Sequence, residues 1–160
     1  LTIGGYMDVK ISCMKIKSIK TPIGNFNSFY DGAQLAKLEF LNHEASAYLI
    51  DQELQKSINI FFDNTALLEN FSSYSPKGTE FQLRVWYALS QIPRGTTESY
   101  LSIAKKIGAP GAARAVGTAC KYNPIPLFIP CHRVVKQDGS IGEFALGAHN
   151  KKYLIDMERE

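Results

Sequence analysis

Apolar and polar residues alternate in short stretches near the beginning of the chain. Residues 16–19, 26–30 and 35–41 each have the length and the apolar residues of a short β-strand. Residues 22–25 and 31–32 lie between them and contain proline, glycine, asparagine and aspartate, which favour tight turns. The pattern predicts three strands joined by turns, and therefore a small antiparallel sheet.

A helical pattern follows these strands over residues 43–62. Residues 63–77 are rich in serine and contain a proline, so we expect them to connect two domains. A chain of 160 residues is long enough for one domain or two small ones. We predict an N-terminal α/β domain over residues 1–74, with a possible tail at 1–13, and a second domain over residues 75–160.

The second half of the chain begins with a strong helix signal. Thr79 and Gln82 have the spacing of a capping box, in which each side chain binds the backbone of the other residue. Apolar residues then recur at helical spacing up to Ile92, and Pro93 with Gly95 ends the pattern. A helix is therefore predicted from Thr79 to about Ile92.

Two shorter helices are expected next. Ser99 is a suitable N-cap for a helix over residues 100–107, and residues 108–110 form a Gly-Ala-Pro turn before a second helix over residues 111–121. This spacing is typical of a helix-turn-helix. The chain is thus predicted to have an α+β fold, in which a small antiparallel-sheet domain with one helix precedes a mainly helical domain with a winged helix-turn-helix-like unit.

Charge is distributed unevenly along the chain, although the net charge is only +3. Between residues 84 and 136 there is a single acidic residue, Glu98, and the basic residues are Arg84, Arg94, Lys105, Lys106, Arg114, Lys121, Arg133 and Lys136. Such an asymmetry is typical of a nucleic-acid-binding surface. Chance clustering on a solvated face is the alternative.

Several classes of protein are disfavoured by the composition. The three cysteines include no Cys-x-x-Cys pair, which argues against a disulfide framework and against a zinc finger, and we predict neither a metal nor a cofactor. No apolar run is long enough to cross a bilayer, and the first residues lack the pattern of a secretory signal. We expect an intracellular protein with reduced thiols and no membrane partner.

The most informative chemistry lies at Cys131, His132 and Arg133, which are consecutive and lie between two apolar stretches. Only a deprotonated thiol is a strong nucleophile, and a neighbouring base or cation lowers a cysteine pKa. We therefore expect Cys131 to be a nucleophile with a lowered pKa. A cysteine hydrolase that uses Cys131 with His132 or His149 is an alternative function for such a site.

The motifs around this cysteine resemble those of a known family. Residues 129–134 read Ile-Pro-Cys-His-Arg-Val, residues 114–117 read Arg-Ala-Val-Gly, and Asn123 precedes a proline. This combination resembles the O6-alkylguanine-DNA alkyltransferases, which are methylated-DNA–protein-cysteine methyltransferases, and the likeness extends over about half of the chain, from Gly78 to Glu158. The resemblance implies DNA repair by direct, irreversible and stoichiometric transfer of an alkyl group from O6-alkylguanine, and from O4-alkylthymine, to Cys131.

The resemblance also implies roles for particular residues. Cys131 attacks the alkyl carbon, His132 accepts the thiol proton through water, and Glu158 orients the imidazole. Tyr100 assists the transfer of a proton to the departing guanine, while Asn123 and Arg133 are structural supports. Independently of the family, Glu158 follows Leu154 and Ile155 by one turn in a predicted helix over residues 151–159, so a carboxylate on this apolar side needs a partner.

The helix over residues 111–121 is unusual for a recognition helix because nearly all its side chains are small. The resemblance implies docking in the minor groove of double-stranded DNA, with Arg114 filling the stack left by a flipped base; flipping is also required because a thiol cannot reach a stacked base. The other expected DNA contacts are Ala112, Ala113, Ala115, Gly117 and Lys121. The alternative is close packing of two helices and a salt bridge at Arg114.

The expected substrate pocket consists of Cys120, Val134, Phe144 and Ala145. The family usually has Gly-Gly-Tyr where this chain has Gly142, Glu143 and Phe144, so the range of adducts it accepts is open. A module that binds alkylated DNA without turnover is a further alternative function. We expect a monomer that acts in the cytoplasm of a prokaryote or the nucleus of a eukaryote.

Overall fold

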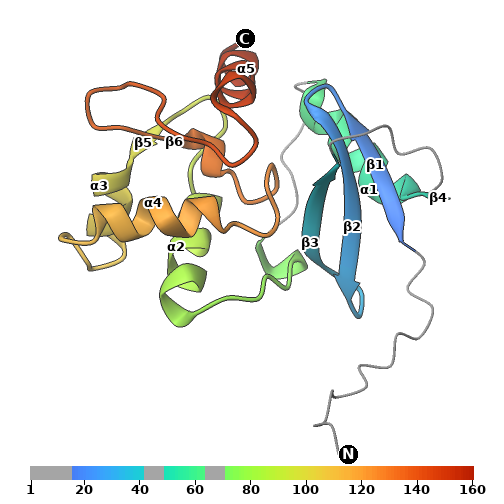
Figure 1. Cartoon of the computed structure of the whole chain (residues 1–160), viewed down its shortest axis with the longest axis horizontal. Coiled ribbons are helices and arrows are strands. Elements are labelled where there is room, and N and C mark those ends of the chain that lie inside the picture. Colours follow the sequence, from blue (N-terminus) through green and yellow to red (C-terminus); the bar gives the residue numbers. More distant parts are fainter. Residues whose placement is uncertain (1–15, 42–48, 64–70) are drawn as a thin grey trace, which may run out of the picture.

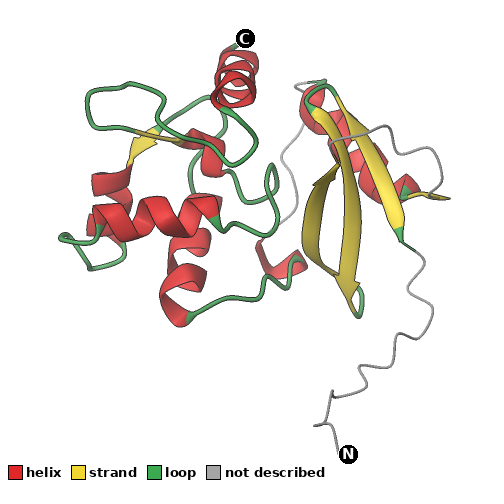
Figure 2. Cartoon of the chain, in the orientation of Figure 1, coloured by secondary structure: helices red, strands yellow, loops and turns green. Residues whose placement is uncertain are grey.

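The computed structural model describes residues 16–41, 49–63 and 71–160. Within these ranges a β-sheet and one helix form the N-terminal part, on the right in Figure 1, and further helices form the C-terminal part. Figure 2 shows how strands are concentrated in the first part and helices in the second. The predicted α+β class is confirmed, whereas the possible tail at residues 1–13 lies outside the described residues.

The sheet has the strand order β3-β2-β1-β4. Strands β1 (Lys17–Thr21), β2 (Gly24–Asp31) and β3 (Gln34–Leu41) are antiparallel neighbours, as predicted. Strand β4 (Leu49–Ile50) was not predicted and pairs parallel to β1, so the sheet is antiparallel in its main part and mixed at one edge.

Helix α1 (Gln52–Phe62) is shorter than the helix predicted over residues 43–62. Residues 49 and 50 belong to β4 and residues 43–48 lie outside the described residues, so the prediction was wrong for the described part of this segment before Gln52. The physical reason is Asp51, whose side chain accepts a hydrogen bond from the Leu54 amide and caps the helix at this point.

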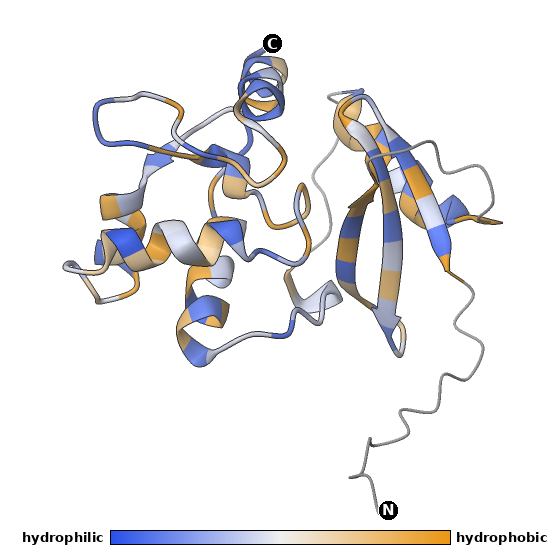
Figure 3. Ribbon diagram, in the orientation of Figure 1, coloured by the Kyte–Doolittle hydropathy of each residue, from blue (hydrophilic) through white to orange (hydrophobic). Residues whose placement is uncertain are grey.

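Alternating side chains place the core between the sheet and α1. Hydrophobic and hydrophilic residues alternate along β3 in Figure 3, as expected for a strand with one face buried. Helix α1 packs against β1. The buried cluster contains Ile19, Phe26, Leu35 and Leu38 from the strands and Leu54, Ile58 and Phe61 from α1.

Helix α2 (Glu80–Ser90) begins with the predicted capping box. The Gln82 amide lies 3.2 Å from the Thr79 hydroxyl oxygen, and the Gln82 side-chain oxygen accepts a 2.9 Å hydrogen bond from the Thr79 amide. Trp86 on this helix is fully buried in the core, and its indole N–H donates a 2.9 Å hydrogen bond to the backbone oxygen of Ala119. This contact joins α2 to the helix that contains Ala119.

Helices α3 (Tyr100–Lys106) and α4 (Ala113–Lys121) form the predicted helix pair. The Ser99 hydroxyl accepts a 3.0 Å hydrogen bond from the Ser102 amide, which confirms the predicted N-cap. None of the helices in the described part of the chain combines the length and the apolarity that a bilayer crossing requires.

The chain then leads from α4 to the cysteine. Cys131–Arg133 form a 3₁₀ turn rather than a strand, and β6 (Val134–Val135) follows and pairs in parallel with β5 (Glu98–Ser99). This pairing brings the beginning of α3 beside the cysteine turn. Helix α5 (Ala148–Arg159) starts three residues before the predicted helix and completes this part.

The two parts share one buried cluster. The rings of Tyr74 and Phe128 meet edge to face at 5.7 Å, and the amide of Leu38 in β3 donates a 2.8 Å hydrogen bond to the backbone oxygen of Pro124. The division into two domains at residues 74 and 75 stays a prediction.

Candidate active site

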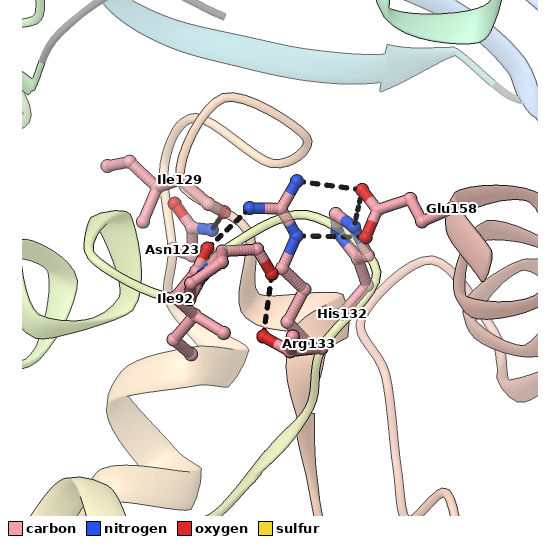
Figure 4. Close-up of polar contacts among 8 residues, drawn as sticks. Ile92, Asn123, Ile129, His132, Arg133 and Glu158 are labelled. Atoms are coloured by element: carbon pink, nitrogen blue, oxygen red, sulfur yellow. Dashed lines mark hydrogen bonds and ion pairs between the residues drawn. The ribbon is translucent and has the colours of Figure 1, made fainter. Parts of the chain in front are cut away.

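Cys131 is buried at the beginning of the 3₁₀ turn, where its sulfur accepts a 3.1 Å hydrogen bond from Nδ2 of Asn123. The same amide nitrogen donates a 2.7 Å hydrogen bond to the backbone oxygen of Ile129, and Oδ1 accepts one of 3.0 Å from the Ile125 amide. Figure 4 shows Asn123 beside Ile129. Asn123 therefore ties the segment after α4 to the residues that lead to the turn, and it also contacts the sulfur.

The cysteine thiol is protonated in this setting. Burial raises the pKa of Cys131, and the Asn123 hydrogen bond and the positive charge of Lys151 oppose that effect without overcoming it. The expectation of a lowered pKa from the adjacent His132 and Arg133 was therefore wrong, because their side chains bind Glu158 instead. Forming the thiolate requires a base.

His132 is fully buried and supplies a suitable base. Its Nε2 atom lies 2.8 Å from Oε1 of Glu158 (Figure 4). Burial raises the pKa of the Glu158 carboxyl, but the hydrogen bonds from His132 and Arg133 outweigh it and hold that pKa at about 2. The carboxylate can only accept, so Nε2 carries the hydrogen and Nδ1 has the lone pair.

The Nδ1 atom of His132 is buried and has no hydrogen-bond partner among the described residues. Burial lowers the pKa of His132, and Glu158 only partly offsets this effect. The resting imidazole is therefore neutral and has a free lone pair on Nδ1. The preceding residue, Cys131, carries a protonated thiol.

Arg133 ties the site to two other elements. Its Nε and Nη2 atoms donate hydrogen bonds of 2.9 and 2.8 Å to the two carboxylate oxygens of Glu158 on α5. Its Nη1 atom donates a 2.7 Å hydrogen bond to the backbone oxygen of Ile92, after α2. Paired, charge-assisted bonds of this kind fix the carboxylate in position, which fits the structural role expected for Arg133.

Lys151 is a site residue that the sequence analysis missed. Its side chain is buried, and Nζ lies 3.4 Å from the Tyr100 hydroxyl and 3.2 Å from the backbone oxygen of Glu143. Among the described residues, no carboxylate lies within 4.0 Å of this ammonium group. A signal existed, because Lys151 precedes Leu154 and Glu158 by three and seven residues and so shares their helix face.

Tyr100 is half-buried at the beginning of α3. Burial, followed by the nearby Cys120, Cys131 and Glu143, raises the pKa of its hydroxyl to about 12. The group is therefore a neutral phenol, which can donate a proton or a hydrogen bond.

A cavity of about 620 Å³ adjoins Cys131. It is lined by Tyr100, Ala113, Arg114, Gly117, Thr118, Cys120, Lys121, Cys131, Lys136, Glu143, Phe144 and Ala145. Three of the four expected pocket residues line it. The fourth, Val134, is fully buried and does not line it, because β6 turns this side chain into the core. Burial raises the pKa of Cys120, so this second thiol is a poor nucleophile.

Helix α4 presents its small residues beside the cavity. Arg114, Ala115 and Lys121 are exposed, and Ala112, Ala113 and Gly117 are partly exposed. Where the structure describes the chain, Arg114 forms no ion pair within 4.0 Å, so the alternative of a salt bridge at this position is not seen. The side chain borders the cavity instead.

Metal ligation has no obvious basis in the described ranges, where no group of three or more histidine, cysteine, aspartate or glutamate side chains is placed to hold an ion. His43 lies outside the described residues, and His149 is exposed on the first turn of α5.

Comparison with known proteins identifies the family. Residues 80–160 match the family described as 6-O-methylguanine DNA methyltransferase, DNA binding domain. A methylated-DNA–protein-cysteine methyltransferase of Methanosarcina mazei is 37% identical over 150 residues, which cover 88% of this chain and 94% of the relative. The chain belongs to the methylated-DNA–protein-cysteine methyltransferase family. The resemblance in the sequence motifs is thereby confirmed.

Other members of the methyltransferase family show how the likeness is distributed. The Mycobacterium tuberculosis methyltransferase is 51% identical over 83 residues. The matched residues make up 52% of this chain and 50% of that relative, so the chain spans about half of the relative's length. The crystal structure of Mycobacterium tuberculosis OGT in complex with DNA has a TM-score of 0.78 at 36% identity, and the match covers 89% of this chain and 91% of that chain.

Proposed function

We propose that this protein repairs DNA by transferring the alkyl group of O6-alkylguanine to Cys131, once per protein molecule. The observation that carries the proposal is the position of Cys131 at the wall of a cavity, where its sulfur is bound by Asn123. The next residue, His132, is paired with Glu158. The names of the relatives and the crystal structure of one of them with DNA support the same reaction class.

The reaction begins with removal of the thiol proton. The lone pair on Nδ1 of His132 accepts it, through a water molecule, and Glu158 stabilises the imidazolium that forms. The thiolate then attacks the alkyl carbon, so that a sulfur–carbon bond forms while the carbon–oxygen bond to guanine breaks. A thioether has no good leaving group, which makes the transfer irreversible and stoichiometric.

The buried Lys151 and Tyr100, which lines the cavity, stabilise the charges that develop in this step. The buried Lys151 ammonium stabilises the thiolate, as its effect on the pKa of Cys131 indicates. Tyr100, a neutral phenol, donates its proton toward a ring nitrogen of the departing guanine. Without this proton the guanine would leave as an anion.

Access to the base requires that it leave the DNA stack. Helix α4 fits the minor groove because most side chains on its exposed face are small. Arg114 borders the cavity, where it can fill the position that the flipped base leaves in the DNA stack. Lys121 contributes positive charge at the end of the same helix. The protein acts as a monomer, on O4-alkylthymine as well, and inside the cell, where its DNA substrate lies.

An alkylated-DNA-binding module without turnover is not favoured, because the acceptor thiol is present at the cavity. Membership in the methyltransferase family also disfavours a cysteine hydrolase. Glu143 and Phe144 line the cavity and set which alkyl groups fit.

The proposal is tested by incubating the protein with a duplex oligonucleotide that contains O6-methylguanine. Intact-mass measurement should show one added methyl group per molecule, and peptide mapping should place it on Cys131. Cys131→Ala should gain none, whereas Cys120→Ala, which removes the other thiol of the cavity, should still be methylated. Methylation of Cys120, or repair of many lesions per molecule, would contradict the proposal.

A further inference from the structure

Helix α1 of the N-terminal part reaches the His132 side of the active site. Phe61, in its last turn, is only 1% exposed, and its ring meets the imidazole of His132 edge to face, with 6.2 Å between the ring centres and an interplanar angle of 79°. A residue of the N-terminal part thus covers the proposed base, although no motif around Cys131 includes it.

The Phe61 ring also contacts a cation. The guanidinium of Arg94 lies over the ring at 4.9 Å from its centre. Burial lowers the pKa of Arg94, and the Glu158 carboxylate opposes that effect, so Arg94 is within electrostatic range of the carboxylate that orients His132.

The turn that contains Arg94 lies directly against α5. Gly95 has a φ of +77°, and a side chain there would place its first carbon 3.0 Å from the backbone oxygen of Glu158. The glycine therefore permits a close approach of the turn to the last turn of α5. Phe61 packs against both His132 and this turn.

We propose that Phe61 is a positioning residue of the alkyl-transfer site: its ring shields the His132 imidazole from bulk solvent and holds the Arg94 guanidinium beside Glu158. The inference rests on the proposed function, in which His132 is the base. It gives the N-terminal part a role in the reaction through its contact with the base, without any contact with substrate.

The charged groups around His132 determine what loss of the ring should do. Glu158 and Lys151 face it from α5, Arg133 follows it in the 3₁₀ turn, and Cys131 precedes it. Burial is the largest cause of its lowered pKa. Removing the ring admits water, so the imidazole should titrate at a higher pH, nearer to its ordinary range.

The experiment compares Phe61→Leu with Phe26→Leu. Both changes remove a fully buried ring, but Phe26 meets Phe40 within the sheet, at 5.3 Å, and serves as a matched control for lost packing. Three quantities are measured for each protein: the midpoint of thermal unfolding, the titration of the His132 ring by nuclear magnetic resonance, and the rate of methyl transfer in a single turnover. The chain has three histidines, so the ring signals are few.

Both variants should unfold at lower temperature than the wild type. Only Phe61→Leu should raise the pKa of His132, by roughly half a unit or more. Its transfer rate should also fall more steeply between roughly pH 8 and pH 6, because a larger share of the base is already protonated there.

Equal His132 titrations and equal pH dependence in the two variants would overturn the proposal and leave Phe61 as a packing residue. If Phe61→Leu does not fold, Phe61→Met, which keeps an unbranched apolar side chain, carries the same expectations. The titration requires no DNA. It therefore decides the role of Phe61 even if the wild-type protein transfers no methyl group, an outcome that would count against the proposed function instead.

Discussion

His132 and Glu158 are 26 residues apart in the chain, yet Nε2 of the imidazole lies 2.8 Å from Oε1 of the carboxylate. The carboxylate is ionised and also binds Arg133, so its orientation is fixed by two partners. This arrangement leaves the lone pair of the imidazole on Nδ1.

Glu158→Gln should slow methyl transfer by roughly tenfold or more, because an amide neither stabilises an imidazolium nor matches Arg133. DNA affinity should stay nearly unchanged. Glu160→Gln, which changes an exposed carboxylate near the end of the same helix, is the control. Single-turnover kinetics and a binding titration distinguish the two, and equal rates in both variants would return Glu158 to a structural role.

Glu158 should also make stability depend on acid pH. Its folded-state pKa of about 2 is below the ordinary value of 4.5, so the stability that it contributes is fully present above 4.5 and is lost as the pH falls toward 2. This contribution is on the order of 3 kcal/mol at neutral pH. As the pH falls, the urea midpoint of unfolding should decrease less steeply for Glu158→Gln than for the wild type. An equal decrease in the two proteins would contradict this expectation.

Asn123→Asp should raise the pKa of the Cys131 thiol. The aspartate keeps an oxygen for the Ile125 amide, but it removes the N–H that binds the sulfur and adds a negative charge nearby. The thiolate absorbance in the ultraviolet should therefore develop at higher pH than in the wild type. Asn123→Ala, which removes the same N–H without the added charge, should shift it less. No shift in Asn123→Ala would contradict the role of the hydrogen bond.

Lys151→Met should slow the transfer by roughly tenfold, because the thiolate would lose a buried cation that lowers the pKa of the thiol. Lys152→Met removes the neighbouring lysine, which is exposed, and should leave the rate unchanged. Single-turnover rates across pH test this. If the two variants react equally fast, Lys151 has no electrostatic effect on the thiol.

Arg114→Ala should lose much of its rate on duplex O6-methylguanine and react almost normally with the free base. Extruding a base from the stack costs a few kcal/mol, and this cost is absent for a free base. Lys121→Ala should instead weaken DNA binding uniformly and lower the salt slope by about one. An equal loss of rate on both substrates would mean that Arg114 supports the fold or the thiol.

Local signals predicted the helices of the C-terminal part well. Thr79 with Gln82 and Ser99 begin α2 and α3 where expected, because a cap is decided by a few neighbouring residues. The beginning of α1 was missed although Asp51 is a good cap, since the helical pattern before it was read as continuous. The pairing of β4 with β1 depends on residues far apart in the chain and has no local signal.

Site residues could be predicted where they belong to a sequence motif or a periodic pattern. They could not be predicted where only the packing of distant segments brings them to the site. Cys131, His132 and Glu158 belong to motifs and helix periodicity. Lys151 looks like its exposed neighbour until the phase of α5 is considered, and Phe61 reaches His132 only because α1 packs beside the cysteine turn. The raised pKa of Cys131 likewise follows from burial, which the neighbouring residues in the sequence do not indicate.

The outer edge of β3 is covered by two separate segments of the chain. The Ser75 amide donates a 2.8 Å hydrogen bond to Leu35, and the Leu38 amide donates one to Pro124, in the segment that leads to the cysteine. An uncovered strand edge is a template for association with other chains. Separating the two parts at residues 74 and 75 would expose this edge, so fragments cut there should be less soluble than the intact chain, even if each retained its own secondary structure.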